Sequence, residues 1–224
     1  MIRLLLVAVL IMWGSVSMGQ NFRLGFQASP HFTWMSSTNG GINNIETKPG
    51  IKYGLEADIF MAGYQRYILN TGLFVSNHSF SARYVLDQSF DINTTTFDKS
   101  VDLTFKMNYI ELPLNIKLRS DQFYRMTFYG QFGLTNLFNI SASASSDDAS
   151  FSGEKLNEGI NNRSIRFYNL CMLMGGGMEY DVGGNTAINL GVQYSNGLSD
   201  VTNLGRLNEK TVFNSLRLVV GVMF

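Results

Sequence analysis

The chain has 224 residues, and its 17 lysine and arginine residues balance its 17 aspartate and glutamate residues, so the formal net charge is zero. This balance, without any run of basic residues, is not the pattern of a protein that binds nucleic acid. Cys171 is the only cysteine, which excludes an internal disulfide and a cysteine-based metal cluster. After residue 19 no apolar run is long enough to predict a membrane-spanning helix.

The first 19 residues have the pattern of a cleaved signal peptide. Arg3 provides a positive charge, and the apolar run that follows, Leu4 to Trp13, is too short to span a bilayer. Ser17 and Gly19 are small residues placed three and one positions before the expected cut. We therefore expect residues 1–19 to be removed and residues 20–224 to form one domain of about 205 residues. The alternative is a buried N-terminal strand or helix.

The rest of the chain consists of segments in which apolar and polar residues alternate, which is typical of strands with two different faces. In the first segment, for example, Phe26 and Ala28 alternate with Gln27 and Ser29. The predicted strands cover residues 22–34, 51–61, 67–76, 103–118, 126–135, 168–180, 188–195 and 215–224. The polar connections alternate between long and short; the long ones cover residues 36–50, 82–102, 139–164 and 198–211. Residues 82–102 fit either a loop or an extended hairpin beyond the membrane.

The fourth predicted strand contains two irregularities. Apolar residues change parity between Met107 and Ile110, which predicts a bulge near Asn108. Pro113 lacks the N–H that a central strand needs, so we expect a local break in the hydrogen-bond ladder there.

The last strand carries an apolar stripe on one parity that ends at a C-terminal phenylalanine; its members are Leu216, Leu218, Val220, Val222 and Phe224. This strand resembles the final strand of a bacterial outer-membrane barrel, in which the terminal aromatic residue is read by the barrel-assembly machinery. An even number of strands with alternating long and short connections predicts an all-β, eight-stranded antiparallel up-and-down transmembrane β-barrel, with short periplasmic turns. A soluble lipocalin-like barrel, with its apolar parity inside, has the same periodicity.

Charged residues on the minority parity distinguish these two barrels. The set contains Arg23, Lys52, Glu56, Asp58, Glu111, Lys117, Glu179 and Arg217. Four positive and four negative charges are costly in an apolar core but can pair in a narrow polar lumen. Since eight strands enclose only enough room for side chains, we predict a network of charges that plugs the barrel. The alternative is the solvated outer face of a soluble barrel.

Residues that suggest chemistry are few. His78 and Ser79 invite comparison with outer-membrane lipid A deacylases, but neighbours on a strand point to opposite faces and do not form a nucleophile–base pair. Asp147, Asp148 and Glu154 lie in a polar loop that fits solvent better than a divalent cation. We therefore predict no catalytic residue, no metal site and no cofactor.

The segment from Tyr109 to Leu114, Tyr-Ile-Glu-Leu-Pro-Leu, resembles the PorT-like outer-membrane β-barrel family of Bacteroidetes. Other matching features are Gly25 with Pro30, Glu179-Tyr180, the segment Gly197 to Asp200, and Phe224. The resemblance covers the mature chain and implies the barrel fold. Some members of that family are components of the type nine secretion and gliding apparatus, and the family has no catalytic residue to carry over.

We therefore expect a non-enzymatic outer-membrane barrel that acts as a structural or interaction component. The expected partners are outer-membrane lipids and lipopolysaccharide, the barrel-assembly machinery and secretion-system proteins, and no nucleic acid. Two alternatives are an outer-membrane enzyme that acts on lipid A and a small solute channel.

Overall fold

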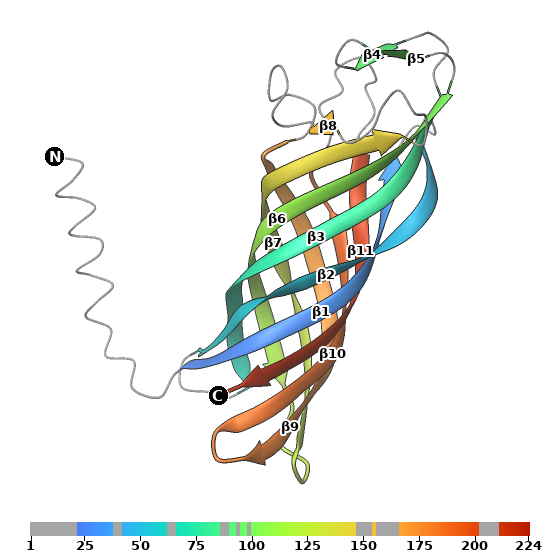
Figure 1. Ribbon diagram of the computed structural model, residues 1–224. Coiled ribbons are helices and arrows are strands. Elements are labelled where there is room, and N and C mark those ends of the chain that lie inside the picture. The colour runs from blue at the N-terminus through green and yellow to red at the C-terminus, as the bar shows by residue number, and fades with distance from the viewer. Residues whose placement is uncertain are drawn as a thin grey trace, which may run out of the picture.

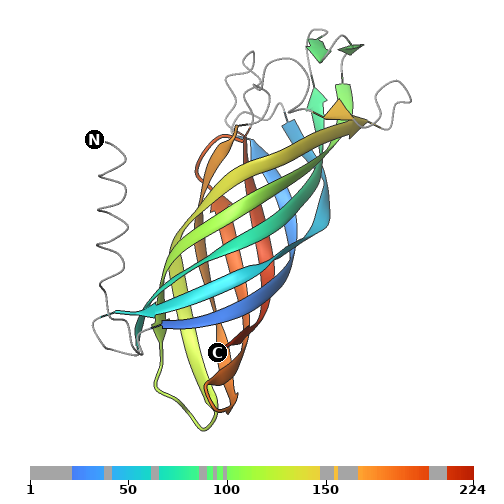
Figure 2. The same ribbon diagram turned by 60° about the vertical axis from the view of Figure 1, so that its left-hand side comes forward.

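The computed structural model describes residues 22–37, 42–61, 66–85, 90–92, 95–97, 100–146, 154–155, 166–201 and 211–224. These residues form a closed barrel of tilted antiparallel strands (Figures 1 and 2). No helix in this part of the chain is long and apolar enough to cross a membrane.

Eight long strands make the barrel wall: β1 (Phe22–Ser37), β2 (Ile42–Phe60), β3 (Tyr67–Val85), β6 (Ser100–Arg119), β7 (Met126–Ser146), β9 (Tyr168–Gly183), β10 (Thr186–Gly197) and β11 (Thr211–Met223). Each pairs antiparallel with the next in the chain, and β11 pairs with β1 to close the barrel. Of three further short strands, β4 (Phe90–Ile92) and β5 (Thr95–Phe97) pair with each other, and β8 (Glu154–Lys155) pairs with β7. The predicted eight-stranded up-and-down topology is confirmed.

The strand register fixes the tilt and width of the barrel. One row of hydrogen-bonded neighbours starts at Phe22 on β1, circles the wall and returns to β1 at Phe32, ten residues further along. Its members in order are Phe22, Ile59, Leu69, Ile116, Phe132, Met174, Tyr194, Leu216 and Phe32. A stagger of ten residues over eight strands corresponds to a tilt of about 40°. Such a barrel has room for inward side chains and for no open channel.

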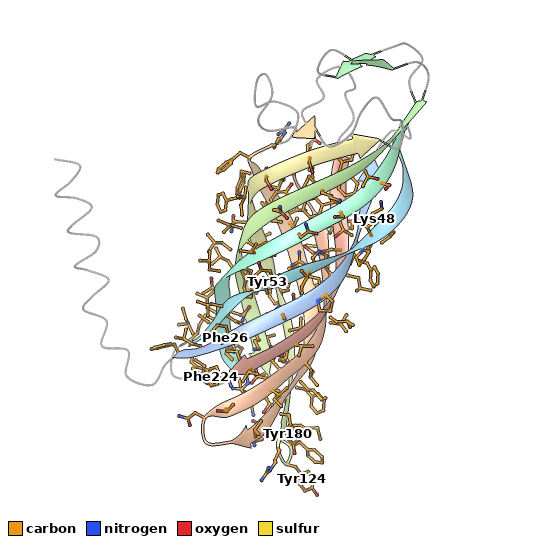
Figure 3. All side chains as sticks on the ribbon, in the orientation of Figure 1. Phe26, Lys48, Tyr53, Tyr124, Tyr180 and Phe224 are labelled. Carbon is orange, nitrogen blue, oxygen red and sulfur yellow. The ribbon has the colours of Figure 1, made fainter. Side chains whose placement is uncertain are left out.

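The apolar parity faces outward. Phe26 is 63% exposed and Leu73 is 54% exposed, whereas Lys117 and Arg217 on the inner face are each 0% exposed. Figure 3 shows side chains such as Phe26 and Tyr53 projecting from the outside of the wall. A soluble barrel would bury the apolar residues and expose the charges, so the lipocalin-like alternative is wrong.

Several strands are longer than the sequence pattern predicts. Residues 42–50 belong to β2 and residues 139–146 belong to β7, although both were expected to be loop. Residues 83–85 pair with residues 100–102 and lengthen the β3–β6 hairpin, so the extended-hairpin alternative holds for them. Alternation does not reveal these extensions because they lack a stripe of large apolar residues on one parity, while the backbone of a hairpin pairs with itself in any solvent.

Both predicted irregularities of β6 are confirmed. The register between β6 and β7 shifts between Asn108 and Tyr109. Pro113 pairs with Thr135 of β7, but the ladder with β3 passes directly from Leu114 to Glu111. The hydroxyl of Thr71 donates to the Pro113 carbonyl at 2.8 Å, so a side chain partly replaces the lost ladder bond.

The short connections and the C-terminus lie together at one end of the barrel, which we call the short-turn end (Figure 1). The β9–β10 turn there has positive φ angles at Gly183 (114°) and Gly184 (67°), which glycine adopts readily. Phe224 is 54% exposed at this end, and its backbone N–H donates to the Leu24 carbonyl at 2.7 Å. The C-terminal residue therefore lies at the seam between β11 and β1.

Candidate functional site

All eight charged residues expected on the inner face lie there. Arg23 is the least buried, with 17% of its side chain exposed, and the other seven are almost fully enclosed. Together with Arg119 and His78, they form two groups at different levels of the lumen. The lower cluster, toward the short-turn end, comprises Arg23, Glu56, Asp58, Lys117, Arg119 and Glu179. The upper cluster comprises Lys52, His78, Glu111 and Arg217.

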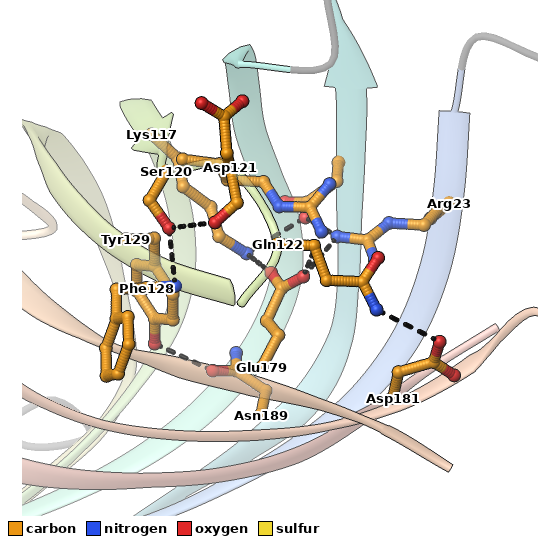
Figure 4. Close-up of polar contacts among 12 residues, drawn as sticks. Arg23, Lys117, Ser120, Asp121, Gln122, Phe128, Tyr129, Glu179, Asp181 and Asn189 are labelled. Atoms are coloured by element: carbon orange, nitrogen blue, oxygen red, sulfur yellow. Dashed lines mark hydrogen bonds and ion pairs between the residues drawn. The ribbon is translucent and has the colours of Figure 1, made fainter. Parts of the chain in front are cut away.

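Lys117 is the centre of the lower cluster. Its Nζ lies 2.9 Å from Asp58 Oδ2 and 2.6 Å from Glu179 Oε1. Arg23 contacts the same two carboxylates, at 3.0 Å and 2.9 Å, as Figure 4 shows for Glu179. Arg119 adds a further contact to Glu179 at 3.0 Å. The cluster therefore joins β1, β2, β6 and β9 across the lumen.

Asn70 completes the lower cluster, although the charge pattern did not predict it. Its amide donates to Glu56 Oε1 at 2.6 Å and to Asp58 Oδ1 at 2.7 Å. This places a donor between two carboxylates that would otherwise repel each other. Arg119 was also missed, but it has the same parity as Lys117, so extending the alternation by one step would have found it.

The ring of Tyr129 supports Lys117 from the neighbouring strand β7. Lys117 Nζ lies 4.5 Å from the ring centroid, a cation–π contact, and the Tyr129 hydroxyl donates to Asn189 Oδ1 at 2.7 Å (Figure 4). The ring can lie flat because Gly177 and Gly191 face it without side chains. A Cβ added at either glycine would lie 2.7 Å or 2.6 Å from the Tyr129 hydroxyl oxygen.

Gly177→Ala is therefore expected to lower the free energy of unfolding by about 1–3 kcal/mol, because the new methyl group collides with the Leu190 carbonyl of β10 and with the Tyr129 hydroxyl. The matched control is Gly130→Ala, since a Cβ at Gly130 meets no atom within 4 Å. Urea unfolding in detergent micelles measures both variants. Equal stability of the two would contradict the packing role of Gly177.

Glu111 is the centre of the upper cluster. Arg217 donates to both of its carboxylate oxygens at 3.1 Å, in a bidentate pair. Lys52 Nζ lies 3.3 Å from Glu111 Oε2 and 4.0 Å from the centroid of the Phe74 ring. Both cations and the carboxylate are almost completely buried, so the pairing is needed to offset their loss of hydration.

His78 belongs to the upper cluster rather than to a nucleophile–base pair. Its Nε2 lies 3.3 Å from Glu111 Oε1, and its Nδ1 lies 3.0 Å from the Thr33 hydroxyl. The ring nitrogens are therefore both engaged with groups other than Ser79. His31 lies beside it, with ring centroids 4.7 Å apart.

The polar loop that carries Asp147, Asp148 and Glu154, expected to be solvated rather than to bind a cation, lies largely outside the described residues, which exclude Asp147, Asp148 and the side chain of Glu154. The signal-peptide prediction also lies outside them, because description begins at Phe22. Among the residues that are described, no group of three or more His, Cys, Asp and Glu side chains could hold a metal ion.

A second candidate site is the turn between β6 and β7, which presents two exposed aromatic rings. Phe123 is 62% exposed and Tyr124 is 84% exposed, and their rings meet edge to face at 4.8 Å. Figure 3 shows Tyr124 at the extreme of the short-turn end. The Gln122 amide donates to the Tyr124 carbonyl at 3.0 Å, and Asp181 N–H donates to the Arg125 carbonyl at 2.7 Å. The turn is therefore fixed to itself and to the β9–β10 hairpin.

Tyr124 has a φ of 54°, a left-handed conformation that costs a residue with a Cβ about 1–2 kcal/mol. Tyr124→Gly is expected to raise the free energy of unfolding by up to about 1 kcal/mol. Phe123→Gly is the control, and it should lower stability because the backbone of Phe123 has no such strain to relieve. Micelle unfolding curves compare the two; a larger loss for Tyr124→Gly than for Phe123→Gly would show that φ is not the deciding term.

A family model described as "Outer membrane protein beta-barrel domain" matches residues 18–203. The chain belongs to this family. It is therefore an outer-membrane protein, and its short-turn end is the periplasmic end by the usual topology of such barrels. A search of curated proteins found no match.

Solved structures similar to this chain are small outer-membrane proteins. Neisserial surface protein A is 16% identical, with a TM-score of 0.46, and the match covers 89% of this chain and 95% of that one. OprG from Pseudomonas aeruginosa is 12% identical, with a TM-score of 0.41 and coverage of 92% and 96%. Ail from Yersinia pestis is 13% identical, with a TM-score of 0.39 and coverage of 92% and 100%.

Proposed function

We propose that this outer-membrane barrel is a non-enzymatic structural or interaction component, and that it serves the type nine secretion or gliding apparatus. The observation that supports this proposal is the filled lumen. Within each cluster, the charged side chains form ion pairs with one another across the barrel. Because side chains fill the lumen, we expect the protein to contact its partners through the two ends of the barrel. The secretion role rests on the resemblance to PorT-like proteins along Tyr109 to Leu114.

The periplasmic end supports an interaction role. Exposed aromatic side chains are favoured at protein interfaces, and a rigid turn loses little conformational entropy on binding. Phe123 and Tyr124 combine both properties, and the strained backbone of Tyr124 is the kind of outlier that clusters at functional sites. We assign this turn to contact with a periplasmic component of the apparatus, and the outer wall to contact with lipids and lipopolysaccharide.

Assembly by the barrel-assembly machinery is part of the same proposal. The exposed ring of Phe224 at the periplasmic seam fits a terminal recognition signal. Phe224→Ser should therefore reduce the amount of folded barrel in the outer membrane while leaving the refolded protein stable in micelles. Normal insertion of this variant would contradict the role of Phe224.

Deleting the gene and measuring export of secreted cargo tests the proposed function. We expect cargo to accumulate in the periplasm, the intact gene to restore export, and a variant with both Phe123→Ser and Tyr124→Ser to insert normally without restoring it. Unchanged export after deletion overturns the secretion role. Steady conductance in planar bilayers would instead support a small channel, and altered lipid A on expression would support an enzyme.

A further inference from the structure

The outer wall changes from apolar to polar at the same level on three neighbouring strands. Val75 of β3, Ile110 of β6 and Phe138 of β7 are directly paired across the sheet and form the last apolar row. On β3 and β6 this row lies about ten residues from the periplasmic end of the strand, which is the length that crosses the hydrocarbon core. The row therefore marks the level at which the acyl chains of the outer leaflet end and the head groups begin.

Polar side chains continue beyond this apolar row on the outer face, and we call them the outer polar patch. Its rows are Asn77, Asn108 and Ser141; then Ser79, Lys106 and Ser143; then Ser81 and Thr104. In the first row Asn77 donates to Asn108 Oδ1 and Asn108 donates to Ser141 Oγ, both at 2.9 Å. In the third row the two hydroxyls are hydrogen-bonded at 2.8 Å. The patch is therefore an ordered surface of amides and hydroxyls.

Two lysine residues give the outer polar patch a positive charge. Lys106 is exposed in the second row and has no hydrogen bond or ion pair to any residue that the structure describes. Lys48 of β2 reaches the third row, where its Nζ lies 3.4 Å from Thr104 Oγ1. Figure 3 shows Lys48 on the half of the wall away from the short-turn end. Since none of the described side chains of the patch is a carboxylate, the patch suits an anionic ligand.

We propose that the outer polar patch binds the head group of lipopolysaccharide, with Lys106 contacting an acidic group such as a phosphate and the amides contacting sugar hydroxyls. The patch continues the lipid-facing wall without a break, so a lipid whose acyl chains lie on Leu73 and Leu112 has its head group on the patch. The proposal rests on the assignment of the outer wall to lipids and lipopolysaccharide in the proposed function. It does not depend on the secretion role.

The position and chemistry of the patch favour this glycolipid over other partners. From Asn77 to Ser81 the patch extends only about 13 Å along tilted strands, so it stays among the head groups and inner sugars. A protein partner would have to displace the lipids that surround the wall at this level. A simple anionic phospholipid would use the lysines but leave most of the neutral donors and acceptors without a partner.

Titration with lipopolysaccharide that carries only lipid A and the inner sugars tests the proposal. The refolded mature protein in neutral detergent micelles is titrated, and binding is followed by microscale thermophoresis at two salt concentrations. Lys106→Gln should weaken binding about fivefold, the usual effect of one basic residue near an anionic lipid surface, and should reduce the salt dependence. Lys106→Arg, which keeps the charge, should bind like the wild type.

Arg66→Gln is the matched control, because it removes an exposed cation at the periplasmic end, and it should also bind like the wild type. Equal binding by Lys106→Gln and the wild type would overturn the proposal. Equal affinity of the wild type for lipopolysaccharide and phosphatidylglycerol would overturn it as well, because the sugars would then contribute nothing.

Asn108→Leu tests the neutral part of the patch, since it breaks the bonds to both Asn77 and Ser141. It should weaken binding of lipopolysaccharide but not of phosphatidylglycerol, and an unchanged affinity for lipopolysaccharide would contradict the role of the amides. If this variant does not fold, Asn77→Leu takes its place. These measurements use the purified protein, so they are independent of any effect of gene deletion on export. A wild type that binds neither lipid would instead overturn the assignment of the outer wall.

Discussion

Replacing Glu111 by glutamine should lower the free energy of unfolding by about 3–5 kcal/mol, the usual cost of breaking a buried ion pair by removing one partner. Glu111 is the carboxylate that binds both Arg217, at 3.1 Å to each oxygen, and Lys52, at 3.3 Å. The glutamine side chain has nearly the same shape, so the loss reports charge rather than packing. Urea titration of the refolded protein in micelles, followed by tryptophan fluorescence and by heat-modifiable migration on gels, measures it.

Asp121→Asn is the matched control for Glu111→Gln. Asp121 pairs with Arg66 at the periplasmic end, but the two side chains are 80% and 62% exposed. Because water screens such a pair, Asp121→Asn should change the free energy of unfolding very little. Combining Glu111→Gln with Arg217→Met should recover part of the lost stability, because an apolar side chain then replaces one of the stranded charges. If Glu111→Gln is as mild as Asp121→Asn, the upper cluster does not hold the barrel together.

The sequence alone predicts the architecture because the physics of a membrane barrel is local along each strand. Alternation identifies which residues face outward, and the charged residues on the other parity identify the lumen. Phe26 beside Gln27, and Leu118 beside Lys117, carry that information without any knowledge of the neighbouring strands. The bulge at Asn108 and the ladder break at Pro113 are predictable for the same reason.

The partners of the lumen charges cannot be predicted in this way, because they depend on the stagger between strands. Glu111 and Lys117 lie on the same face of β6, yet Glu111 binds Arg217 and Lys117 binds Asp58. A shift of two residues between any two strands would exchange these partners without altering the alternation. The strand neighbours of Arg217 are hidden for the same reason, since His31 and Gln193 pair with it only through the register of β1, β10 and β11.

Phe132→Arg should destabilise the barrel by about 2–4 kcal/mol in a lipid bilayer, the cost of an arginine on the lipid-facing side near the midplane. Phe132 is 53% exposed on the outer face of β7, between Phe128 and Phe138. About ten tilted residues span the hydrocarbon core, so a residue near the middle of that interval lies at a depth where an arginine side chain reaches water poorly. Denaturant titration after refolding into phosphatidylcholine vesicles measures the change.

Phe128→Arg supplies the comparison at a different depth on the same strand. Phe128 is 51% exposed, almost the same as Phe132, but it lies four residues closer to the periplasmic turn. An arginine there reaches the headgroups, so its cost should fall to about 0–1 kcal/mol. Since both variants replace phenylalanine by arginine on the outer face of β7, the difference between them measures lipid depth alone. Equal costs, together with a mature protein that stays monodisperse without detergent, would mean that water and not acyl chains covers this face.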